Sequence, residues 1–348
     1  MKLLVIRFSA LGDVAMTVPV LVSLARQYPD VSITMLSRPF VLPLFEESPP
    51  NLHFKGVDLS RYKGAAGLYQ LFRELKREGN YDAIADLHDV LRTKILRTLF
   101  RWTGAKVAHI DKGRKEKRAL TEPRRKALKQ LPSSFDRYEE VFGKLGYPVQ
   151  TAFRSIFEKG KADCALFSQV TGIPDGKHWI GIAPFAAHNG KKLPQATTLR
   201  LIHELSANSD WRIFLFGGGK AENELLEQWA ANCPDNVLSV AGKLKLKGEL
   251  ALMSHLDVMV SMDSANMHLA SLAGTPVVSV WGATHPYAGF MGWGQSIDNA
   301  IQTDLPCRPC SIFGNKPCRR KDYACLTRIT PEMIMQRIRP IVDAPGQA

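Results

Sequence analysis

The sequence predicts an α/β protein built from two domains, each with a parallel β-sheet. Short apolar runs alternate with helical stretches in the first part of the chain, and the alternation begins again near His178. Strands that alternate with helices favour parallel sheets covered by helices. The length of 348 residues also exceeds what one core usually fills, which favours two domains.

In the first half, apolar runs predict four strands and the stretches between them predict helices. The expected strands are residues 2–8, 31–37, 81–88 and 106–110. The expected helices are residues 14–27, 67–78, 91–102 and 133–145. Pro19 lies inside the first helix, so we expect either a kink or a restart with the proline in a first turn.

The second half repeats this architecture after a junction at about residues 158–177. The expected strands are residues 178–185, 211–219, 236–242, 256–262 and 276–282, and the expected helices between them are residues 197–208, 222–231, 248–255 and 264–274. Thr330 followed by Pro331 is typical of a helix start, so a terminal helix is expected there.

The charge of the chain is concentrated in one segment. The formal net charge is +13, and residues 112–129 hold nine Lys or Arg against two Glu. Such a segment attracts polyanions, or it is simply a solvated loop. It lacks interleaved aromatic residues for base stacking, which disfavours nucleic acid and favours an anionic surface or ligand.

The apolar runs are too short for a membrane span, which needs roughly 20 residues. The start "MKLLVIRF" is interpreted as a first strand and not as a signal peptide. A cytoplasmic location is therefore expected.

The first turn, "RFSALGD", ends an apolar strand with one glycine and the carboxylate of Asp13. A dinucleotide site at this place uses G-x-G-x-x-G, which is missing, so a nucleotide-dependent dehydrogenase is disfavoured. Asp13 is either a helix cap or a group that faces a ligand.

Three loops of the second half carry candidate binding groups. In "FLFGGGKAENE", Glu222 either accepts hydrogen bonds from a ribose or complements the helix dipole. In "VSMDSANMHLA", Asp263 ends a strand where ligands bind in open sheets, or else Asp263 and Ser264 only cap the next helix. In "IAPFAAHNGKKLP", Lys191 and Lys192 can neutralise a pyrophosphate.

Four of the six cysteines, spaced C-x2-C-x7-C-x6-C, cluster near the C-terminus: Cys307, Cys310, Cys318 and Cys325. In a cytosolic protein this spacing is a partial match to a structural zinc site. Disulfides and free thiols remain the alternatives.

Together these motifs resemble glycosyltransferase family 9, the lipopolysaccharide heptosyltransferase family. The opening "IRFSALGDVAMTVPVL" is similar to its N-terminal R-x-S-A-L-G-D motif, and "DSANMHLASLAGTPVVSVWGATHP" is similar to its D-[ST]-G-x-x-H block. "GGGKAE" resembles its donor-ribose loop and "AAHNGKKLP" its lysine loop. These motifs extend over nearly the whole chain.

The resemblance implies a GT-B fold, with two Rossmann-like domains facing across a cleft. Residues 1–165 would bind the acceptor, residues 166–329 the nucleotide sugar, and residues 330–348 would form a helix returning toward the N-terminal domain. The resemblance assigns Asp13 as general base; Lys192 (or Lys191) at the diphosphate; Gly218 and Glu222 at the donor ribose; Asp263 at the sugar; Ser264, Ala265, Met267 and His268 near the phosphates; and Ser9 at the acceptor. Arg124 and Arg125 of the basic segment are also expected at the acceptor, because their charge suits its acidic groups.

The implied reaction is inverting, metal-independent transfer of heptose from ADP-heptose to an anionic lipopolysaccharide inner-core acceptor, without a cofactor. It would take place at the inner face of the cytoplasmic membrane. Ala265 replaces the family's glycine, and Asn189-Gly190 replaces a Trp-Pro approach to the lysines. These departures leave open another nucleotide-sugar donor for a cell-surface polysaccharide. A protein of a different class, which only binds nucleotides or nucleic acid, is the remaining alternative.

Overall fold

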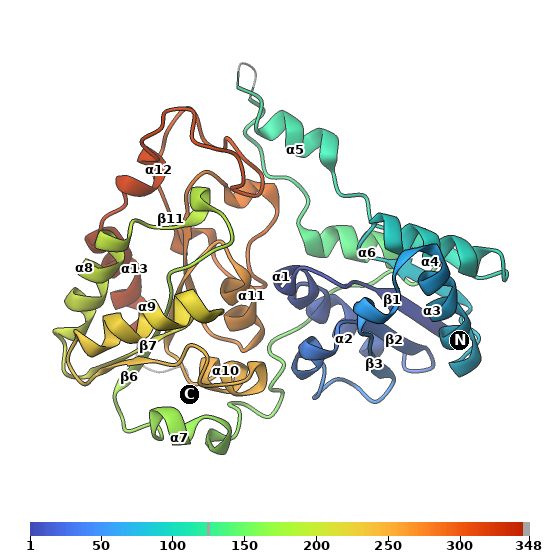
Figure 1. Ribbon diagram of the computed structural model, residues 1–348, viewed down its shortest axis with the longest axis horizontal. Coiled ribbons are helices and arrows are strands. Elements are labelled where there is room, and N and C mark those ends of the chain that lie inside the picture. The colour runs from blue at the N-terminus through green and yellow to red at the C-terminus, as the bar shows by residue number, and fades with distance from the viewer. Residues whose placement is uncertain (124–125, 344–348) are drawn as a thin grey trace. The chain divides into compact units, whose positions relative to one another are not determined.

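The structure is a computed structural model that describes residues 1–123 and 126–343. The chain forms two compact units (Figure 1). The first consists of Met1–Gly113 and Pro132–Ile156, and the second of Arg114–Leu131 and the chain from Phe157 onward. The second unit therefore begins before the boundary expected at residue 165, and it includes a segment inserted in the sequence of the first.

The first unit is a five-stranded parallel sheet in the order β3-β2-β1-β4-β5, covered by helices. Its strands are β1 (Lys2–Ile6), β2 (Ser32–Ser37), β3 (Leu52–Gly56), β4 (Ala83–Asp86) and β5 (Lys106–His109). Its helices are α1 (Leu11–Ala15), α2 (Thr17–Gln27), α3 (Gly64–Glu78), α4 (Leu91–Arg101) and α6 (Ser134–Lys144).

The helix expected over residues 14–27 is two helices. The chain breaks at Met16, and Pro19 lies in the first turn of α2, where its missing N–H costs nothing. The restart is therefore the correct alternative. The central strand β1 is almost wholly buried, and Leu4 and Ile6 pack with Leu96 and Phe100 of α4 in the core of this unit.

The second unit has a six-stranded parallel sheet in the order β11-β10-β9-β6-β7-β8. Its strands are β6 (His178–Ala183), β7 (Trp211–Leu215), β8 (Val237–Ser239), β9 (Val258–Met262), β10 (Val277–Trp281) and β11 (Ala300–Gln302). Its helices are α5 (Arg114–Leu120), α7 (Ser168–Thr171), α8 (Gln195–Ser206), α9 (Lys220–Ala231), α10 (Leu246–Met253), α11 (Ala265–Leu272), α12 (Ala324–Thr327) and α13 (Pro331–Val342).

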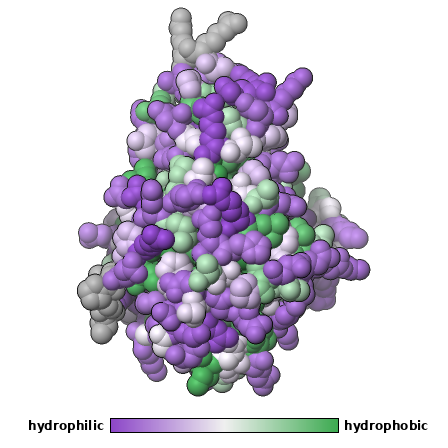
Figure 2. Space-filling model, turned by 90° about the vertical axis from the view of Figure 1, so that its left-hand side faces the viewer, coloured by the Kyte–Doolittle hydropathy of each residue, from purple (hydrophilic) through white to green (hydrophobic). Residues whose placement is uncertain are grey.

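The terminal helix α13 begins as predicted, because the Thr330 side chain accepts a hydrogen bond from the amide of Met333 and Pro331 occupies the first turn. Its described residues pack on α8 and against β9 and β10, so this helix belongs to the second unit. The side of the protein that carries α8 and α13 is mostly hydrophilic, with scattered apolar side chains (Figure 2).

The basic segment includes a helix that was not expected. Within Arg114–Leu131, residues 114–120 form α5, and Leu120 and Leu131 are buried against Ala288. The amide of Leu131 also donates to the carbonyl of Tyr287. Leu120 and Leu131 thus anchor the segment in the second unit, while most of its described cations are exposed. In the described part of the chain, no helix is long and apolar enough to cross a membrane.

Candidate functional site

Asp13 lies in the first turn of α1, directly after the strand β1. Its Oδ2 is 2.8 Å from an Nη of Arg7 and accepts a 3.0 Å hydrogen bond from the amide of Ala10. The Asp13 side chain keeps 34% of its surface exposed, while that of Arg7 keeps 8%. Both contacts use the same oxygen, and the hydrogen bond from the amide of Ala10 caps the start of α1. The exposed part of the carboxylate is still open to a ligand.

Arg7 is held in place from the other side by backbone groups. Its guanidinium donates to the carbonyls of Ser9 and Leu87, at 3.0 and 2.5 Å. The hydroxyl of Tyr138, a fully buried residue, donates to the carbonyl of Asp13 at 3.3 Å. The cation therefore has a fixed position, which in turn fixes the rotamer of Asp13.

Ser9 lies next to His88, which the sequence did not identify as a site residue. The Ser9 hydroxyl is 3.3 Å from Nε2 of His88, and the amide of Phe8 points at Nδ1 from 3.5 Å. Burial, together with the positive charges of Arg7 and Lys112, lowers the pKa of the His88 imidazole to about 4. His88 is therefore neutral at physiological pH.

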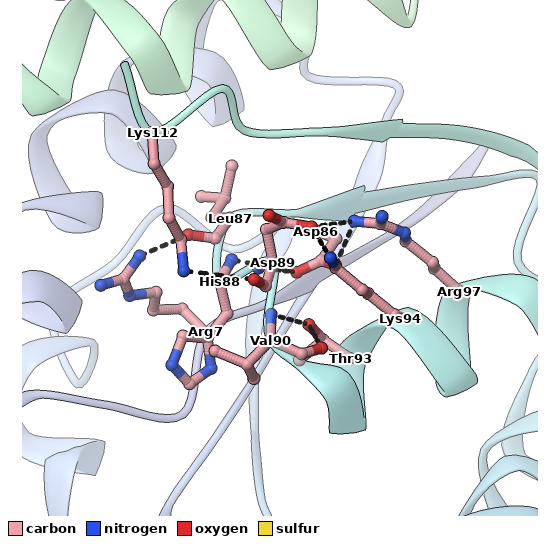
Figure 3. Close-up of polar contacts among 10 residues, drawn as sticks. All are labelled: Arg7, Asp86, Leu87, His88, Asp89, Val90, Thr93, Lys94, Arg97 and Lys112. Carbon is pink, nitrogen blue, oxygen red and sulfur yellow. Dashed lines mark hydrogen bonds and ion pairs between the residues drawn. The ribbon is translucent and has the colours of Figure 1, made fainter. Parts of the chain in front are cut away.

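A buried acidic turn supports this region from behind (Figure 3). Asp86, at the end of β4, is wholly buried and accepts hydrogen bonds from the amides of His88 and Asp89. Arg97 of α4 reaches back to both carboxylates, 2.8 Å from Asp86 and 3.0 Å from Asp89. Lys112 donates to the carbonyl of Asp89. The turn that carries His88 is therefore rigid.

In the second unit, Asp263 and Lys191 form a nearly buried ion pair. Asp263 follows β9, and its Oδ2 lies 2.9 Å from Nζ of Lys191. The two side chains are 4% and 15% exposed. Asp263 thus lies at the carboxyl end of a central strand, where parallel sheets place their ligands.

The lysine loop is held by close backbone packing. Lys191 ends a short 3₁₀ turn, Asn189–Lys191, and the carbonyl of Gly190 accepts a 2.7 Å hydrogen bond from the amide of Ala283. A side chain at position 190 would clash with the carbonyl of Gly314. Lys192 follows this turn with a half-buried side chain and no ion pair to any described residue. The two lysines therefore have different surroundings.

The helix α11 begins immediately after Asp263. Ser264 occupies the N-cap position, but its side chain does not cap the helix; its hydroxyl lies 3.3 Å from that of Ser261. The expected capping hydrogen bond is therefore absent, and the first amides of α11 stay available. Ala265 is half-buried, while Met267 and His268 are buried on the inner side of the helix.

Glu222 lies in the first turn of α9, after the glycine-rich exit of β7. Its Oε2 accepts a 3.1 Å hydrogen bond from the amide of Gly218. Gly219 has φ 92°, a left-handed conformation that favours glycine, so the turn itself accounts for the glycine at position 219. Glu222 caps its own helix here and is half-buried beside the exposed Gly218.

The four clustered cysteines line one cavity of about 290 Å³ together with Lys126 and Arg308. All six cysteines of the chain are free. Among the described residues, no group of three or more His, Cys, Asp or Glu is arranged to hold a metal ion. Of the three alternatives for these cysteines, the structure has free thiols. Burial raises the pKa of the Cys325 thiol to about 11, so Cys325 is protonated at neutral pH.

Lys126 ties the basic segment to this cysteine loop by donating to the carbonyls of Pro306 and Arg308 at 2.9 and 3.0 Å. The neighbouring Arg124 and Arg125, expected at the acceptor, lie outside the described residues.

Comparison with known proteins decides the family. A family model described as glycosyltransferase family 9 (heptosyltransferase) matches residues 68–323. The chain belongs to glycosyltransferase family 9. It is therefore a glycosyltransferase, as its motifs predicted.

Curated relatives align over most of their lengths. Lipopolysaccharide heptosyltransferase 1 of Pseudomonas aeruginosa is 24% identical, with 99% of both chains covered. Lipooligosaccharide heptosyltransferase 2 of Campylobacter jejuni is 22% identical, with 95% of both covered. Lipopolysaccharide heptosyltransferase 3 of Escherichia coli is 25% identical over 78% of this chain and 81% of the relative.

Solved structures confirm the GT-B fold of this glycosyltransferase. A family 9 glycosyltransferase from Veillonella parvula superposes with a TM-score of 0.74 at 19% identity, covering 99% of this chain and 98% of that one. The Escherichia coli heptosyltransferase WaaC with ADP gives 0.68 at 21% identity, covering 98% and 100%.

The sequence missed Arg7, His88 and Arg97 as parts of the site. Arg7 is itself part of the R-x-S-A-L-G-D motif. It directly follows the first strand, in the same turn that leads to Asp13, and this position was the available signal that the two side chains lie close together. His88 follows the strand β4, whose carboxyl end lies beside that of β1, which is a signal for proximity to Ser9.

Proposed function

We propose that this glycosyltransferase moves a heptose from ADP-heptose to an anionic lipopolysaccharide inner-core acceptor, with inversion at the anomeric carbon and without a metal ion. The observation that carries the proposal is the Lys191–Asp263 ion pair at the start of α11. It gathers a carboxylate, a cation and open helix amides at one strand end, which suits a sugar joined to a diphosphate. The relatives are named as heptosyltransferases, which favours heptose as the sugar.

The donor is proposed to bind the second unit in three parts. The ribose hydroxyls donate hydrogen bonds to the carboxylate of Glu222, beside Gly218. The diphosphate lies at the amides after Ser264 and is neutralised by Lys192, whose charge no described acid offsets. The sugar contacts Asp263, which the ion pair with Lys191 holds in place. WaaC structures with ADP and with ADP-2-deoxy-2-fluoro heptose support an adenine nucleotide over a uridine nucleotide.

Asp13 is proposed as the general base in the first unit, which binds the acceptor. The acceptor hydroxyl oxygen bonds to the anomeric carbon while the bond from that carbon to the diphosphate oxygen breaks, and the hydroxyl proton passes to Asp13. ADP leaves with the electron pair of the broken bond. A single displacement of this kind inverts the anomeric carbon. Transition-state charge falls on the sugar ring and on the diphosphate, and Asp13 and Lys192 respectively stabilise it.

This arrangement supplies positive charge without a metal, because lysines and helix amides take the place that Mg²⁺ has at other diphosphates. Ser9, beside neutral His88, is proposed to hydrogen-bond the acceptor. The cations of residues 112–129, including Arg124 and Arg125, are proposed to attract the acidic groups of the acceptor.

A transfer assay with a panel of donors tests the proposal. The full-length protein is incubated with an inner-core acceptor and with ADP-heptose, ADP-glucose or UDP-glucose, in buffer with EDTA. We expect product from ADP-heptose alone, with the opposite anomeric configuration by NMR. Transfer from UDP-glucose, or loss of transfer in EDTA, would refute the donor or the metal-independent mechanism.

A further inference from the structure

The helix α4 of the first unit exposes large apolar side chains at both its ends. Leu91 is 76% exposed and Trp102, which directly follows the helix, is 78% exposed. These are the most exposed large apolar residues in the described part of the chain. They are separated by about three helical turns at 3.6 residues a turn, so both lie on the same side of α4.

That side of α4 faces away from the core. The opposite side buries Thr93, Leu96 and Phe100, and two of these belong to the core of the first unit. Leu91 and Trp102 therefore do not contribute to the core of the first unit. In Figure 1, α4 lies beside α3 at the periphery of the first unit.

The sequence from α4 to β5 carries charge of one sign. Residues 91–110 contain five Lys or Arg and no Asp or Glu. Arg101 near the end of α4 and Lys106 on the edge strand β5 are exposed, and neither forms an ion pair with a described residue. Lys94 is also exposed, although it contacts Asp89 at 3.6 Å.

We propose that this α4 face, defined by Leu91, Arg101, Trp102 and Lys106, binds the surface of a membrane that contains anionic phospholipid. Tryptophan prefers the boundary between headgroups and acyl chains, and leucine inserts beside it. Arg101 and Lys106 then meet lipid phosphates, each contact adding to the attraction of an anionic surface. The choice of partner rests on the proposed function, since an inner-core acceptor is attached to lipid.

The other candidate is the basic segment, whose apolar residues are mostly committed to packing. Leu120 and Leu131 are buried against the second unit, and only Leu128, 53% exposed, is available there. The α4 face differs because it combines apolar and cationic groups that the fold leaves exposed.

Co-sedimentation with vesicles tests the assignment. Vesicles are phosphatidylethanolamine with phosphatidylglycerol, 3:1, against pure phosphatidylcholine. We expect the double variant Leu91→Ser/Trp102→Ser to bind anionic vesicles about tenfold more weakly, since two inserted side chains are lost. Ile173→Ser, at a 65% exposed position of the second unit, and Leu128→Ser are the matched controls and should bind as wild type.

Trp102 also serves as its own probe. Trp179, Trp211, Trp229 and Trp281 are at most 5% exposed and Trp293 is half-buried. All five are kept in Trp102→Phe, so the fluorescence difference between wild type and this variant reports position 102. Quenching of that difference by brominated phospholipid supports insertion. Absence of quenching, or loss of binding in Leu128→Ser but not in the α4 double variant, would overturn the proposal.

A water-soluble, deacylated acceptor separates this inference from the proposed function. The α4 double variant should transfer to it at the wild-type rate, because neither substituted residue is part of the proposed machinery. If neither protein transfers, the proposed function is wrong, and the vesicle result still decides the membrane surface.

Discussion

Arg7 and Asp13 form an ion pair of 2.8 Å at the first turn of the chain, with the arginine nearly buried and the carboxylate one-third exposed. The guanidinium donates hydrogen bonds to two backbone carbonyls, which fix its position, and its ion pair in turn fixes the position of the Asp13 carboxylate. A proton acceptor held in this way needs little reorganisation during reaction.

Replacement of Arg7 should therefore impair the reaction more than substrate binding. We expect Arg7→Met to lower kcat about 100-fold, because a misplaced group costs rates of this order, with a small change in donor KM. Arg7→Lys should restore part of the loss, since it returns the charge without the second hydrogen bond. Steady-state kinetics measure both. A rise in donor KM at unchanged kcat would contradict the positioning role.

The neighbouring lysines should separate stability from chemistry. Lys191→Met leaves the carboxylate of Asp263 buried and unpaired, so we expect a loss of about 3 kcal/mol in the free energy of unfolding. Lys192→Met should leave the unfolding free energy nearly unchanged and reduce transfer. Urea denaturation of both variants checks this contrast. Equal stability of the two would show that the Lys191–Asp263 pair contributes little.

The turn that carries His88 is stabilised by the nearly buried side chain of Arg97, which pairs with Asp86 and Asp89. Arg97→Leu removes the partner of the fully buried Asp86, and we expect it to cost about 3 kcal/mol of unfolding free energy. Arg101→Leu, one helical turn further along α4 and exposed, is the matched control and should change stability little. Thermal or urea unfolding distinguishes them, and similar behaviour of both variants would contradict the argument.

His88 predicts a pH dependence of stability. Its pKa is about 4 in the folded protein and near 6.5 when unfolded, so between these values the unfolded chain binds the extra proton. The unfolding free energy should then fall as the pH drops from about 6.5 to about 4. His88→Gln should show a shallower fall in urea titrations across this range. An unchanged pH profile would show that His88 is not buried as a neutral group.

Much of the fold can be predicted from local sequence patterns. The residues that orient the candidate site residues cannot. Buried strands such as β1 and β9 are mostly apolar runs, and the helix start at Thr330 uses a standard cap. The local sequence therefore predicts these strands and this helix start. The edge strands β3 and β11 were missed because both are only partly apolar and β11 has just three residues.

The supports of the site depend on contacts distant in sequence, which a single sequence does not display. Arg7 meets Leu87, and Lys191 meets Asp263, only because parallel strands bring their carboxyl ends together. The motif resemblance singled out Asp13 and Asp263 as candidate site residues, but it did not identify Arg7 as the partner of Asp13 or Lys191 as the partner of Asp263. The choice of Lys191 as the partner of Asp263 likewise required the structure, since two adjacent lysines are indistinguishable by spacing.

The most direct test of the central claim is transfer by Asp13→Ala, measured together with ADP binding by calorimetry on the same preparation. The account predicts that transfer from ADP-heptose falls to background while the affinity for ADP stays at the wild-type value, because the proposed nucleotide site lies in the second unit and Asp13 in the first. Transfer that persists at a rate close to wild type would contradict the assignment of Asp13 as the base.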